Sequence, residues 1–296
     1  ISSGTITMPP PIPNIAANRP ATMPIAISGY GLILGRSSAR ATGLWYPGMG
    51  ADPLVRLRAA PEHSALLLDV DGTLAPIVAR PELSAVPADV LAVLGGLVER
   101  YALVGCVSGR TALDAARLVP VPGVRIAGNH GLELLVDGEV RLAGGVEEWL
   151  DDVRSVAEAV GPIAMEAGGW VELKGASLSI HFRQAPDPER ARAILDERAV
   201  PLVAAAGLVS RWGRMTLEAR PPVPVDKGSA VEELLAECPA VRWSLYAGDD
   251  RTDLDAFGVV DVRVAVRSDE TPDDLLDAAD VAVDGTDGLA ELLRSL

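Results

Sequence analysis

Lysine is nearly absent from this chain of 296 residues. The sequence has 26 basic residues, and only Lys174 and Lys227 are lysines, each followed by a glycine. Arginine serves the ordinary surface positions, so the two lysines are candidates for functional roles; biased codon usage and chance are the alternative explanation. Basic residues are also outnumbered, since the formal net charge is −15. This balance argues against nucleic acid and anionic membranes as partners, because both require clustered basic side chains.

Cysteine and long apolar runs are scarce as well. Cys106 and Cys238 lie far apart, which gives neither a disulfide framework nor metal-ligand spacing. We interpret both as packing residues of a protein in a reducing compartment, the cytoplasm. No apolar run reaches the ~18 residues that a membrane span requires. A small anionic substrate is still compatible with this composition, because its site needs only a few local cations.

The first 50 residues differ in composition from the rest. They hold seven prolines and three arginines but no acid, so the remaining body has 23 bases against 41 acids. Such a proline-rich segment cannot sustain a helix or a strand ladder. We therefore expect a disordered extension over residues 1–60. The run MPIAISGYGLILG is a weak match to a signal peptide, because Pro24, Gly29 and Gly31 interrupt it.

Short apolar segments alternate with helical patterns through most of the body. The stretches SALLLDV, ALVGCVS and VRIAGN predict buried strands, and the stretches between them have apolar residues at helical spacing. The same alternation returns between residue 223 and the end of the sequence. Short apolar strands separated by helices indicate a parallel sheet that is covered on both faces. The predicted fold class is therefore α/β.

The middle of the chain, residues 146–222, has a different pattern. WVELKG and SLSIHFR are strand-like and adjacent, as are LVSRWG and RMTLEAR. Strands that follow each other without a helix between them indicate a small antiparallel sheet. The sequence thus predicts an α+β module over 146–222, inserted between two parts of the core at 61–145 and 223–296.

Two acids follow the first predicted strand, in LLLDVDGTLAPIV. Asp69 and Asp71 have the i, i+2 spacing that places strand residues on one face. Ligands of open parallel sheets bind beyond the carboxyl ends of strands. Two carboxylates there repel each other, and a divalent cation such as Mg²⁺ would offset the repulsion. Gly72 and Thr73 then form a tight turn whose backbone N–H groups can hold phosphate oxygens.

A second group of acids, Asp249, Asp250 and Asp253 in YAGDDRTDLDAF, follows another apolar strand. Five acids at two strand ends are hard to explain without a metal. Ser108 in VSGR offers a hydroxyl group at a turn before a helix, and Lys227 in VDKG can neutralise a phosphate. Each stretch alone has a structural explanation, since DGT is a common turn and GDDRTD suits a helix N-cap. Their joint occurrence, in this order, indicates a phosphate site.

The stretches DVDGT, VSGR, Lys227 and GDDRTD resemble, in order, the four motifs of the haloacid dehalogenase superfamily of phosphatases. The resemblance spans residues 62–296 and implies a Rossmann-like parallel sheet with an inserted α+β cap, a Mg²⁺ cofactor and an aspartyl-phosphate intermediate. It implies that Asp69 is the nucleophile and that Asp71, crowded by other acids, is the general acid and then the base. Ser108 and Lys227 would hold the transferring phosphoryl group.

The same resemblance implies the metal ligands and phosphate contacts. The Mg²⁺ ligands would be the carboxylates of Asp69 and Asp249 and the backbone carbonyl of Asp71, supported by Asp250 and Asp253. The further substrate contacts in the core would be Thr73, Gly109 and Arg110.

Three further stretches, GNHGLE, WVELKGASLSIHFR and MTLEARPPVPVDKG, resemble trehalose-6-phosphate phosphatases. The resemblance implies that Glu172, Lys174 and Glu218 contact sugar hydroxyls. It also implies that Asn129 and His130 belong to the substrate-binding set at the core–cap border. Structural explanations compete with these roles. His130 could simply fix a loop, and Glu172 and Lys174 could form a solvent-facing pair. His181 could be a histidine with its hydrogen bonds satisfied on a half-buried strand.

The predicted function is Mg²⁺-dependent hydrolysis of trehalose 6-phosphate to trehalose and phosphate, a step of trehalose biosynthesis. One alternative is a related sugar phosphatase that acts on sucrose phosphate or mannosylglycerate phosphate. The other is a catalytically inactive module that binds a sugar phosphate and partners a trehalose-phosphate synthase. Neither nucleic acid nor a membrane is expected as a partner.

Overall fold

The computed structural model describes residues 52–296 except residues 79 and 214. The expected disordered extension therefore lies outside the described residues as far as residue 51. From residue 52 on, the structure differs from that expectation, because Val55–Ala59 form helix α1 and Leu57 is fully buried. The guanidinium group of Arg56 also stacks over the ring of Trp243, 4.3 Å from its centroid. Residues 52–60 thus belong to the folded core.

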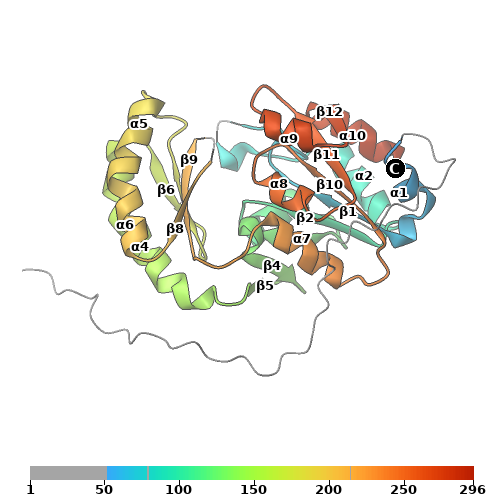
Figure 1. Cartoon of the computed structure of the whole chain (residues 1–296), viewed down its shortest axis with the longest axis horizontal. Helices are drawn as coiled ribbons and strands as arrows, with labels where there is room; N and C mark the ends of the chain where they lie inside the picture. The colour runs from blue at the N-terminus through green and yellow to red at the C-terminus, as the bar shows by residue number, and fades with distance from the viewer. Residues whose placement is uncertain (1–51, 79, 214) are drawn as a thin grey trace, which may run out of the picture. The chain divides into compact units, whose positions relative to one another are not determined.

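Among the described residues, a sheet of eight strands forms the core (Figure 1), in the order β12-β11-β10-β1-β2-β3-β4-β5. Neighbouring strands from β12 to β3 pair in parallel, and β4 and β5 add an antiparallel edge. The strands are β1 (Ser64–Leu68), β2 (Leu103–Val107), β3 (Arg125–Gly128), β4 (Glu133–Val136), β5 (Glu139–Leu142), β10 (Trp243–Gly248), β11 (Val262–Arg267) and β12 (Val281–Asp284). This arrangement confirms the predicted α/β class.

The hairpin of β4 and β5 was not predicted from the sequence. It turns at Asp137 and Gly138, whose φ angles are 53° and 84°. Asp-Gly between two apolar segments is the usual sequence of a two-residue hairpin turn, because both positions need a left-handed backbone. The stretch ELLVDGEVRL therefore contains the signal for this hairpin.

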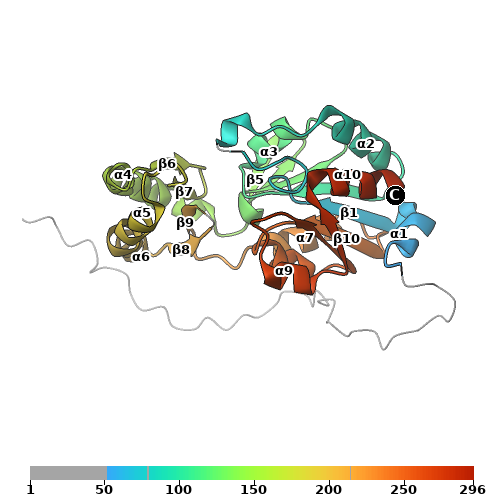
Figure 2. The same ribbon diagram turned by 90° about the horizontal axis from the view of Figure 1, so that it is seen from above.

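Helices cover both faces of the core sheet (Figure 2). Alternate residues of a strand point to opposite faces, so Leu66 and Leu68 of β1 pack with one set of helices and Leu67 with the other. The first set is α1, α2 (Ala88–Val98), α3 (Ala112–Leu118) and α10 (Gly285–Ser295); the second is α7 (Lys227–Ala236), α8 (Asp253–Phe257) and α9 (Asp273–Ala278). The uninterrupted apolar run in β1 is thus explained by burial on both sides.

The inserted part contains a four-stranded antiparallel sheet, β6-β7-β9-β8, which we call the cap sheet. Its strands are β6 (Trp170–Leu173), β7 (Leu178–His181), β8 (Val209–Trp212) and β9 (Thr216–Arg220), and its helices are α4 (Leu150–Glu166), α5 (Pro188–Ile194), the π-helical η5 (Leu195–Ala199) and α6 (Val200–Ala205). The helices pack against one face, through Leu178, Ile180 and Leu217. The other face has polar side chains side by side, because Ser179 pairs with Glu172 on one flank and with Glu218 on the other.

Four short 3₁₀ turns complete the described structure: η1 (Pro61–His63), η2 (Pro81–Leu83), η3 (Asn129–Gly131) and η4 (Glu147–Trp149). None of the helices in the described ranges combines the length and the apolar character needed to cross a bilayer.

Candidate active site

The candidate site begins where the strand order of the core sheet reverses. Strand β1 lies between β2, which follows it in the chain, and β10, which comes much later. Asp69 follows β1 directly, and its N–H group donates to the carbonyl of Ala247 in β10 at 2.9 Å. Asp249 follows β10 directly. The two acids therefore meet at the carboxyl edge of the sheet, at the crevice where open α/β sheets bind ligands.

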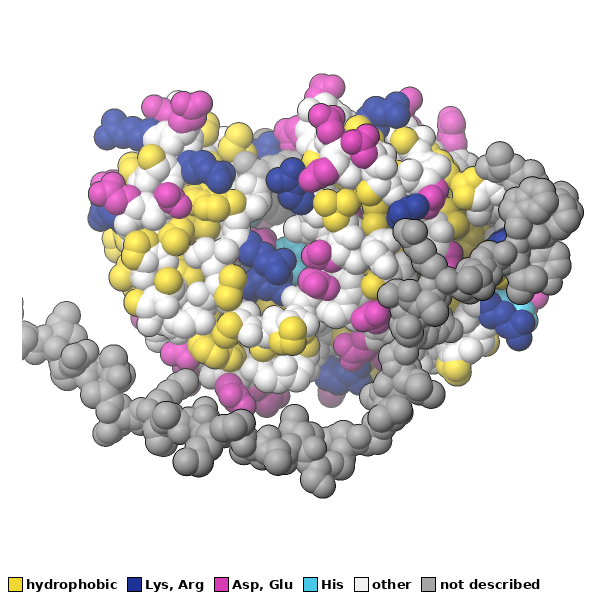
Figure 3. Space-filling view, viewed as in Figure 1, with side chains coloured by type: hydrophobic (Ala, Val, Ile, Leu, Met, Phe, Trp, Pro, Cys, Tyr) yellow, Lys and Arg dark blue, Asp and Glu magenta, His cyan; other side chains and the backbone are white. Residues whose placement is uncertain are grey.

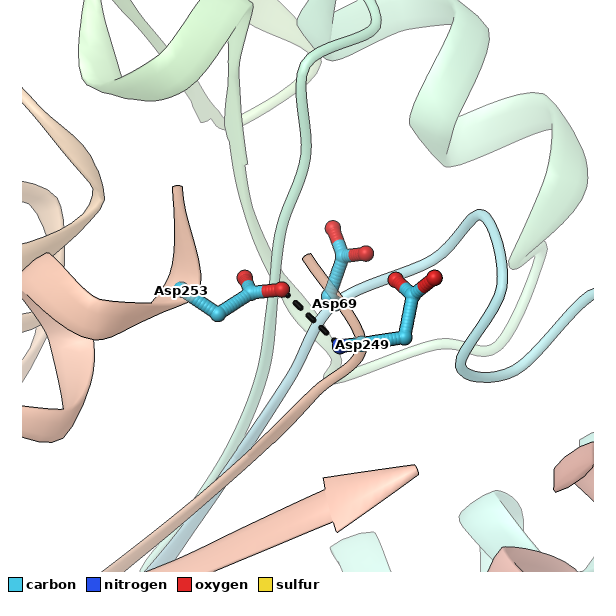
Figure 4. A group of neighbouring side chains, drawn as sticks. All are labelled: Asp69, Asp249 and Asp253. Carbon is cyan, nitrogen blue, oxygen red and sulfur yellow. Dashed lines mark hydrogen bonds between the residues drawn. The ribbon is translucent and has the colours of Figure 1, made fainter. Parts of the chain in front are cut away.

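Three buried carboxylates form a cluster at this edge (Figure 4). One oxygen from each of Asp69, Asp249 and Asp253 lies within 4.8 Å of the other two. The Asp249 carboxylate occupies the space above Gly72, where an added Cβ would lie only 2.2 Å from Oδ2. Gly72 also has a φ of 85°, so both the space and the backbone at this turn require glycine. Clustered carboxylate oxygens are the donor set of a hard divalent cation, so the cluster could hold a metal ion.

Asp253 holds the cluster together by accepting four hydrogen bonds. Its Oδ1 accepts from Lys227 Nζ at 2.6 Å and from the Tyr246 hydroxyl at 2.8 Å. Its Oδ2 accepts from the backbone N–H groups of Asp249 and Asp250, both at 2.9 Å. Figure 4 shows Asp253 turned toward the Asp249 backbone, while the carboxylates of Asp69 and Asp249 point the same way. Asp69 and Asp249 are therefore the better placed pair for a cation. The role of Tyr246 was missed, because the sequence contains no signal for it.

Lys227 is the buried counter-charge of the cluster. It opens helix α7 behind a capping box formed by Asp226 and Ser229, and its Nζ also donates to Asp69 Oδ1 at 2.8 Å. Burial works to lower the pKa of Lys227, but Asp253 and Asp69 outweigh burial and raise it. Burial raises the pKa of Asp69 well above its usual range; Asp253 and Asp249 add to this effect and Lys227 opposes it. A cation next to Asp69 would favour its carboxylate form.

Asp71 has different neighbours from those expected. The sequence predicted crowding by other acids, but its carboxylate accepts a two-pronged contact from Arg110, with Nε to Oδ2 at 2.6 Å and one terminal nitrogen to Oδ1 at 2.7 Å. Ser84 Oγ donates to the same Oδ1 at 3.0 Å. Such a fork fixes both the position and the plane of a carboxylate. Arg110 was predicted to contact substrate, and Ser84 was not predicted at all.

The loop at residues 108–110 is held by the turn Asn129–Gly131, as the N–H of Asn129 donates to the carbonyl of Arg110 at 2.5 Å and that of His130 to the carbonyl of Ser108 at 2.9 Å. The Asn129 side chain is 1% exposed. Its Nδ2 donates to Glu133 Oε1 at 3.0 Å and to the carbonyl of Lys174 at 3.2 Å, and its Oδ1 accepts from Ser177 at 2.5 Å. The expected contact between Asn129 and substrate therefore finds no support in this geometry.

The cap contributes two carboxylates and an ammonium group. Lys174 Nζ donates to the carbonyl of Gly109 at 3.0 Å and lies 4.0 Å from Glu172 Oε2 and 3.9 Å from Glu218 Oε1. His130 Nε2 lies 3.2 Å from the same Oε1 of Glu218. Burial works to raise the pKa of Glu218, but the charges of His130 and Lys174 hold it well below its usual range. Glu218 thus remains a carboxylate that can accept hydrogen bonds.

His181 supports Glu172. Its Nε2 lies 2.8 Å from Glu172 Oε2, and its ring stacks on Trp170 with 4.3 Å between the ring centroids. Burial works to raise the pKa of Glu172, but the hydrogen bond from His181 and the charge of Lys174 lower it overall. The structural explanation for His181, a histidine with a satisfied hydrogen bond, therefore fits this geometry.

A cleft of about 1700 Å³ brings most of the predicted site residues together. On the face of the molecule drawn in Figure 3, basic, acidic and histidine side chains gather in a hollow. The predicted residues that line the cleft are Asp69, Asp71, Gly109, Arg110, His130, Glu172, Lys174, Glu218, Lys227, Asp249 and Asp250. The predicted residues buried behind it are Thr73, Ser108, Asn129 and Asp253. Among the described residues, the Thr73 hydroxyl has no hydrogen-bond partner.

Comparisons with known proteins agree with this arrangement. The model of the trehalose-phosphatase family matches residues 67–274. A probable trehalose-phosphate phosphatase of Sinorhizobium fredii is 35% identical over 215 residues, which cover 72% of this chain and 79% of that protein. The crystal structure of a trehalose-6-phosphate phosphatase related protein superimposes with a TM-score of 0.67 at 26% identity, and the match covers 78% of this chain and 96% of the other.

The chain also matches part of much longer proteins. An uncharacterized glycosyl hydrolase of Mycobacterium tuberculosis is 34% identical over 220 residues, and the match covers 71% of this chain but only 16% of that protein. The shared region is therefore a small portion of that relative's length. Since the family model covers most of the folded part, including the residues around Asp69 and Lys227, the chain belongs to the trehalose-phosphatase family.

Proposed function

We propose that this chain is a Mg²⁺-dependent phosphatase that hydrolyses trehalose 6-phosphate to trehalose and inorganic phosphate. The observation that carries the proposal is one cleft with two kinds of lining. Its core side has the buried Asp69 and Lys227, and its cap side has Glu172, Lys174 and Glu218. The family membership and the substrate named in the relatives' descriptions support the same reading.

In the proposed reaction, Asp69 is the nucleophile. A bond forms between its carboxylate oxygen and the phosphorus, and the bond from the phosphorus to the sugar oxygen breaks while Asp71 gives that oxygen a proton. Water then attacks the phosphorus, Asp71 takes a proton from this water, and the bond to Asp69 breaks to release phosphate. Both acids leave the end of β1 at i, i+2 spacing, so both are placed at the same edge of the sheet.

Asp69, Asp249 and the backbone carbonyl of Asp71 would hold the Mg²⁺ ion, and Asp250 and Asp253 would support them. The fit rests on two oxygen-donor carboxylates that face the same side and on a glycine turn that leaves room for one of them. When bound, Mg²⁺ supplies positive charge to the phosphoryl oxygens, the main requirement of phosphoryl transfer. Lys227 supplies a second positive charge, fixed to Asp69 at 2.8 Å.

Arg110 and Asp71 would exchange partners during the reaction. In this structure the guanidinium group is forked onto the Asp71 carboxylate. A phosphate group offers the same planar pair of oxygen acceptors, so a substrate in the cleft can take over the fork. Asp71 would then be released to face the sugar oxygen. The fork thus holds the Asp71 carboxyl group in place until substrate arrives.

In this proposal, the cap recognises the sugar. Glu172 and Glu218 are carboxylates with lowered pKa values, so both accept hydrogen bonds from vicinal hydroxyl groups, and Lys174 donates one. A bound sugar must displace part of the present contacts of Lys174. In this proposal, the cap is the segment 146–222 and the core comprises the segments on either side of it.

The test is phosphate release by the purified chain with Mg²⁺, on trehalose 6-phosphate, sucrose 6-phosphate, glucose 6-phosphate and p-nitrophenyl phosphate, each with an EDTA control. A metal-dependent preference for trehalose 6-phosphate is expected. Preference for another sugar ester would favour the related sugar phosphatases. The control variant is Asp69→Asn, because release at the parent rate by that variant would show that Asp69 is not the nucleophile. No release from any ester would favour a binding module that partners a trehalose-phosphate synthase.

We also propose that the chain works in the cytoplasm. Cys106 and Cys238 are both free thiols among the described residues, in agreement with a reducing compartment. Fractionation of cells that express the chain would check this location, and recovery outside the cytoplasmic fraction would contradict it.

A further inference from the structure

The turn Asn129–Gly131, which we call the bracket turn, has an unusual backbone. Asn129, His130 and Gly131 have φ angles of 53°, 55° and 94°, so three consecutive residues are left-handed. This region is unfavourable for residues with a side chain and persists where surrounding contacts enforce it. Gly131 is required as well, because a Cβ there would lie 2.8 Å from the carbonyl oxygen of Asp226.

The backbone of the bracket turn is tied to the core loop that approaches the phosphate site. Its first two N–H groups donate to the carbonyls of Arg110 and Ser108. The side chain of Glu133 adds a second tie, because its Oε2 accepts from the N–H of Ala112 at 2.8 Å and its Oε1 accepts from Asn129. The position of the loop at residues 108–112 and that of the bracket turn are therefore not independent.

The side chains of the bracket turn are tied to the cap instead. Asn129 binds the cap turn at residues 174–177 twice, through the carbonyl of Lys174 and the hydroxyl of Ser177. His130 packs on Gly109, where an added Cβ would lie 2.7 Å from its ring, and reaches Glu218. The cap groups positioned in this way are Lys174 and Glu218, two of the three proposed to read the sugar.

We propose that the bracket turn positions the sugar-reading side of the cap relative to the core loop at residues 108–110, with Asn129 as its positioning residue rather than a substrate ligand. The inference rests on the proposed function, because it assigns the turn a role in the turnover of a sugar ester. Asn129 suits this role because it donates to both domains through Nδ2 and accepts from the cap through Oδ1, while its side chain is shielded from the cleft. Its burial means that it transmits position and does not contact the sugar.

The decisive variant is Asn129→Gly. Glycine adopts a φ of 53° without strain, so the change removes the amide and keeps the backbone turn. The matched control is Asp137→Gly, which removes a side chain from an equally left-handed position in the hairpin of β4 and β5. We expect Asn129→Gly to lower kcat/KM for trehalose 6-phosphate at least about tenfold more than for p-nitrophenyl phosphate, with a rise in KM for the sugar ester. Asp137→Gly should leave the ratio between the two esters unchanged.

Ser177→Ala tests the same contact from the cap side. It removes one donor to Asn129 and should shift the ratio in the same direction by a smaller factor. Added to Asn129→Gly, it should change the ratio less than about twofold, because the acceptor of that hydrogen bond is already gone. The control is Ser155→Ala, on an exposed surface of α4, where the hydroxyl group donates to the carbonyl of Asp151 in the same helix. Full additivity of the Asn129 and Ser177 changes would overturn the proposal, and so would equal losses on both esters.

A readout that is independent of activity separates this inference from the proposed function. The N–H groups of Lys174 and Ala176 donate within the cap turn, to the carbonyls of Ser177 and Lys174 at 2.8 and 2.9 Å. Their hydrogen exchange should become faster in Asn129→Gly and stay at the parent rate in Asp137→Gly. If the parent fails to hydrolyse trehalose 6-phosphate, the proposed function fails while this measurement still decides the role of Asn129. Unchanged exchange in Asn129→Gly would refute the positioning role.

Discussion

Replacing Asp253 should destabilise the core more than any other single change of similar size at the carboxylate cluster. The side chain is fully buried and accepts four hydrogen bonds, two on each oxygen. In Asp253→Asn the shape is kept, but one oxygen becomes an NH₂ group. Whichever way the amide turns, its NH₂ group replaces an oxygen that accepts two hydrogen bonds, either from the backbone N–H groups of Asp249 and Asp250 or from Lys227 and Tyr246.

The expected magnitude follows from the bonds that are lost. A hydrogen bond to a charged group contributes about 1.5–3 kcal/mol, so the loss of two should lower the free energy of unfolding by about 3–6 kcal/mol. The comparison variant is Tyr246→Phe, which deletes one donor to Asp253 and leaves three. Its expected cost is about 1.5–3 kcal/mol on the same basis. Since a domain is typically stable by about 5–15 kcal/mol, the Asp253 change consumes a large share of it.

Urea unfolding, followed by far-ultraviolet circular dichroism and tryptophan fluorescence, measures both changes. EDTA should be present, because a bound cation would stabilise the folded state and conceal part of the loss. The order of the two variants is the critical outcome. If Tyr246→Phe cost as much as Asp253→Asn, or more, Asp253 would not be the acceptor that organises the cluster.

Three further predictions concern other parts of the site. Arg110→Ala should lower turnover of both trehalose 6-phosphate and p-nitrophenyl phosphate by about tenfold or more, because the role proposed for Asp71 applies to both esters. Arg110→Lys should not restore turnover, because a lysine ammonium cannot make the two-pronged contact; a loss confined to the sugar ester would contradict this. Burial works to raise the pKa of Glu218, but its cationic neighbours lower it overall. The difference in free energy of unfolding between the parent and Glu218→Gln should therefore be greatest above about pH 5 and shrink as the pH falls below about 4, where the unfolded chain takes up the proton first. Urea titrations across this pH range measure the difference, and a difference that grows on acidification would refute the prediction. Burial, together with the charge of Asp69, raises the pKa of the Cys106 thiol. Iodoacetamide should therefore alkylate Cys238 before Cys106 in the native protein. Mass spectrometry that showed the reverse order would argue against the burial of Cys106.

Most of the core fold was predictable from the sequence, because a strand that is buried on both faces has a recognisable run of apolar residues. A strand covered by helices on both sides is apolar throughout, and β1 and β2 have this composition. Strand order has no such local pattern. The pairing of β1 with β10 joins segments far apart in the chain, so it depends on tertiary packing. Helix α1 was missed because it is short and lies beside a proline-rich segment, and its buried residue Leu57 is one of only a few apolar residues there.

The site was predictable as a set of residue types but not as a set of contacts. Acids after β1 and β10 had to meet, because the strands turned out to be neighbours. The direction of a side chain depends on what surrounds it, and this explains both main differences. Asp71 faces Arg110 instead of other acids, and Asn129 faces the interior instead of the cleft. The backbone at Asn129 is also left-handed, with a φ of 53°, whereas the strand before it is extended.

The placement of the two lysines has a consequence for chemical modification. Their side chains are 9% and 3% exposed, for Lys174 and Lys227 respectively, and the sequence contains no other lysine. The outer surface of the folded protein therefore offers arginine guanidinium groups but no lysine amine. Reagents that attach dyes, cross-links or solid supports through side-chain amines have to enter the cleft to react. Labelling of the two lysine side chains thus reports on the accessibility of the site, and occupancy of the cleft should block it.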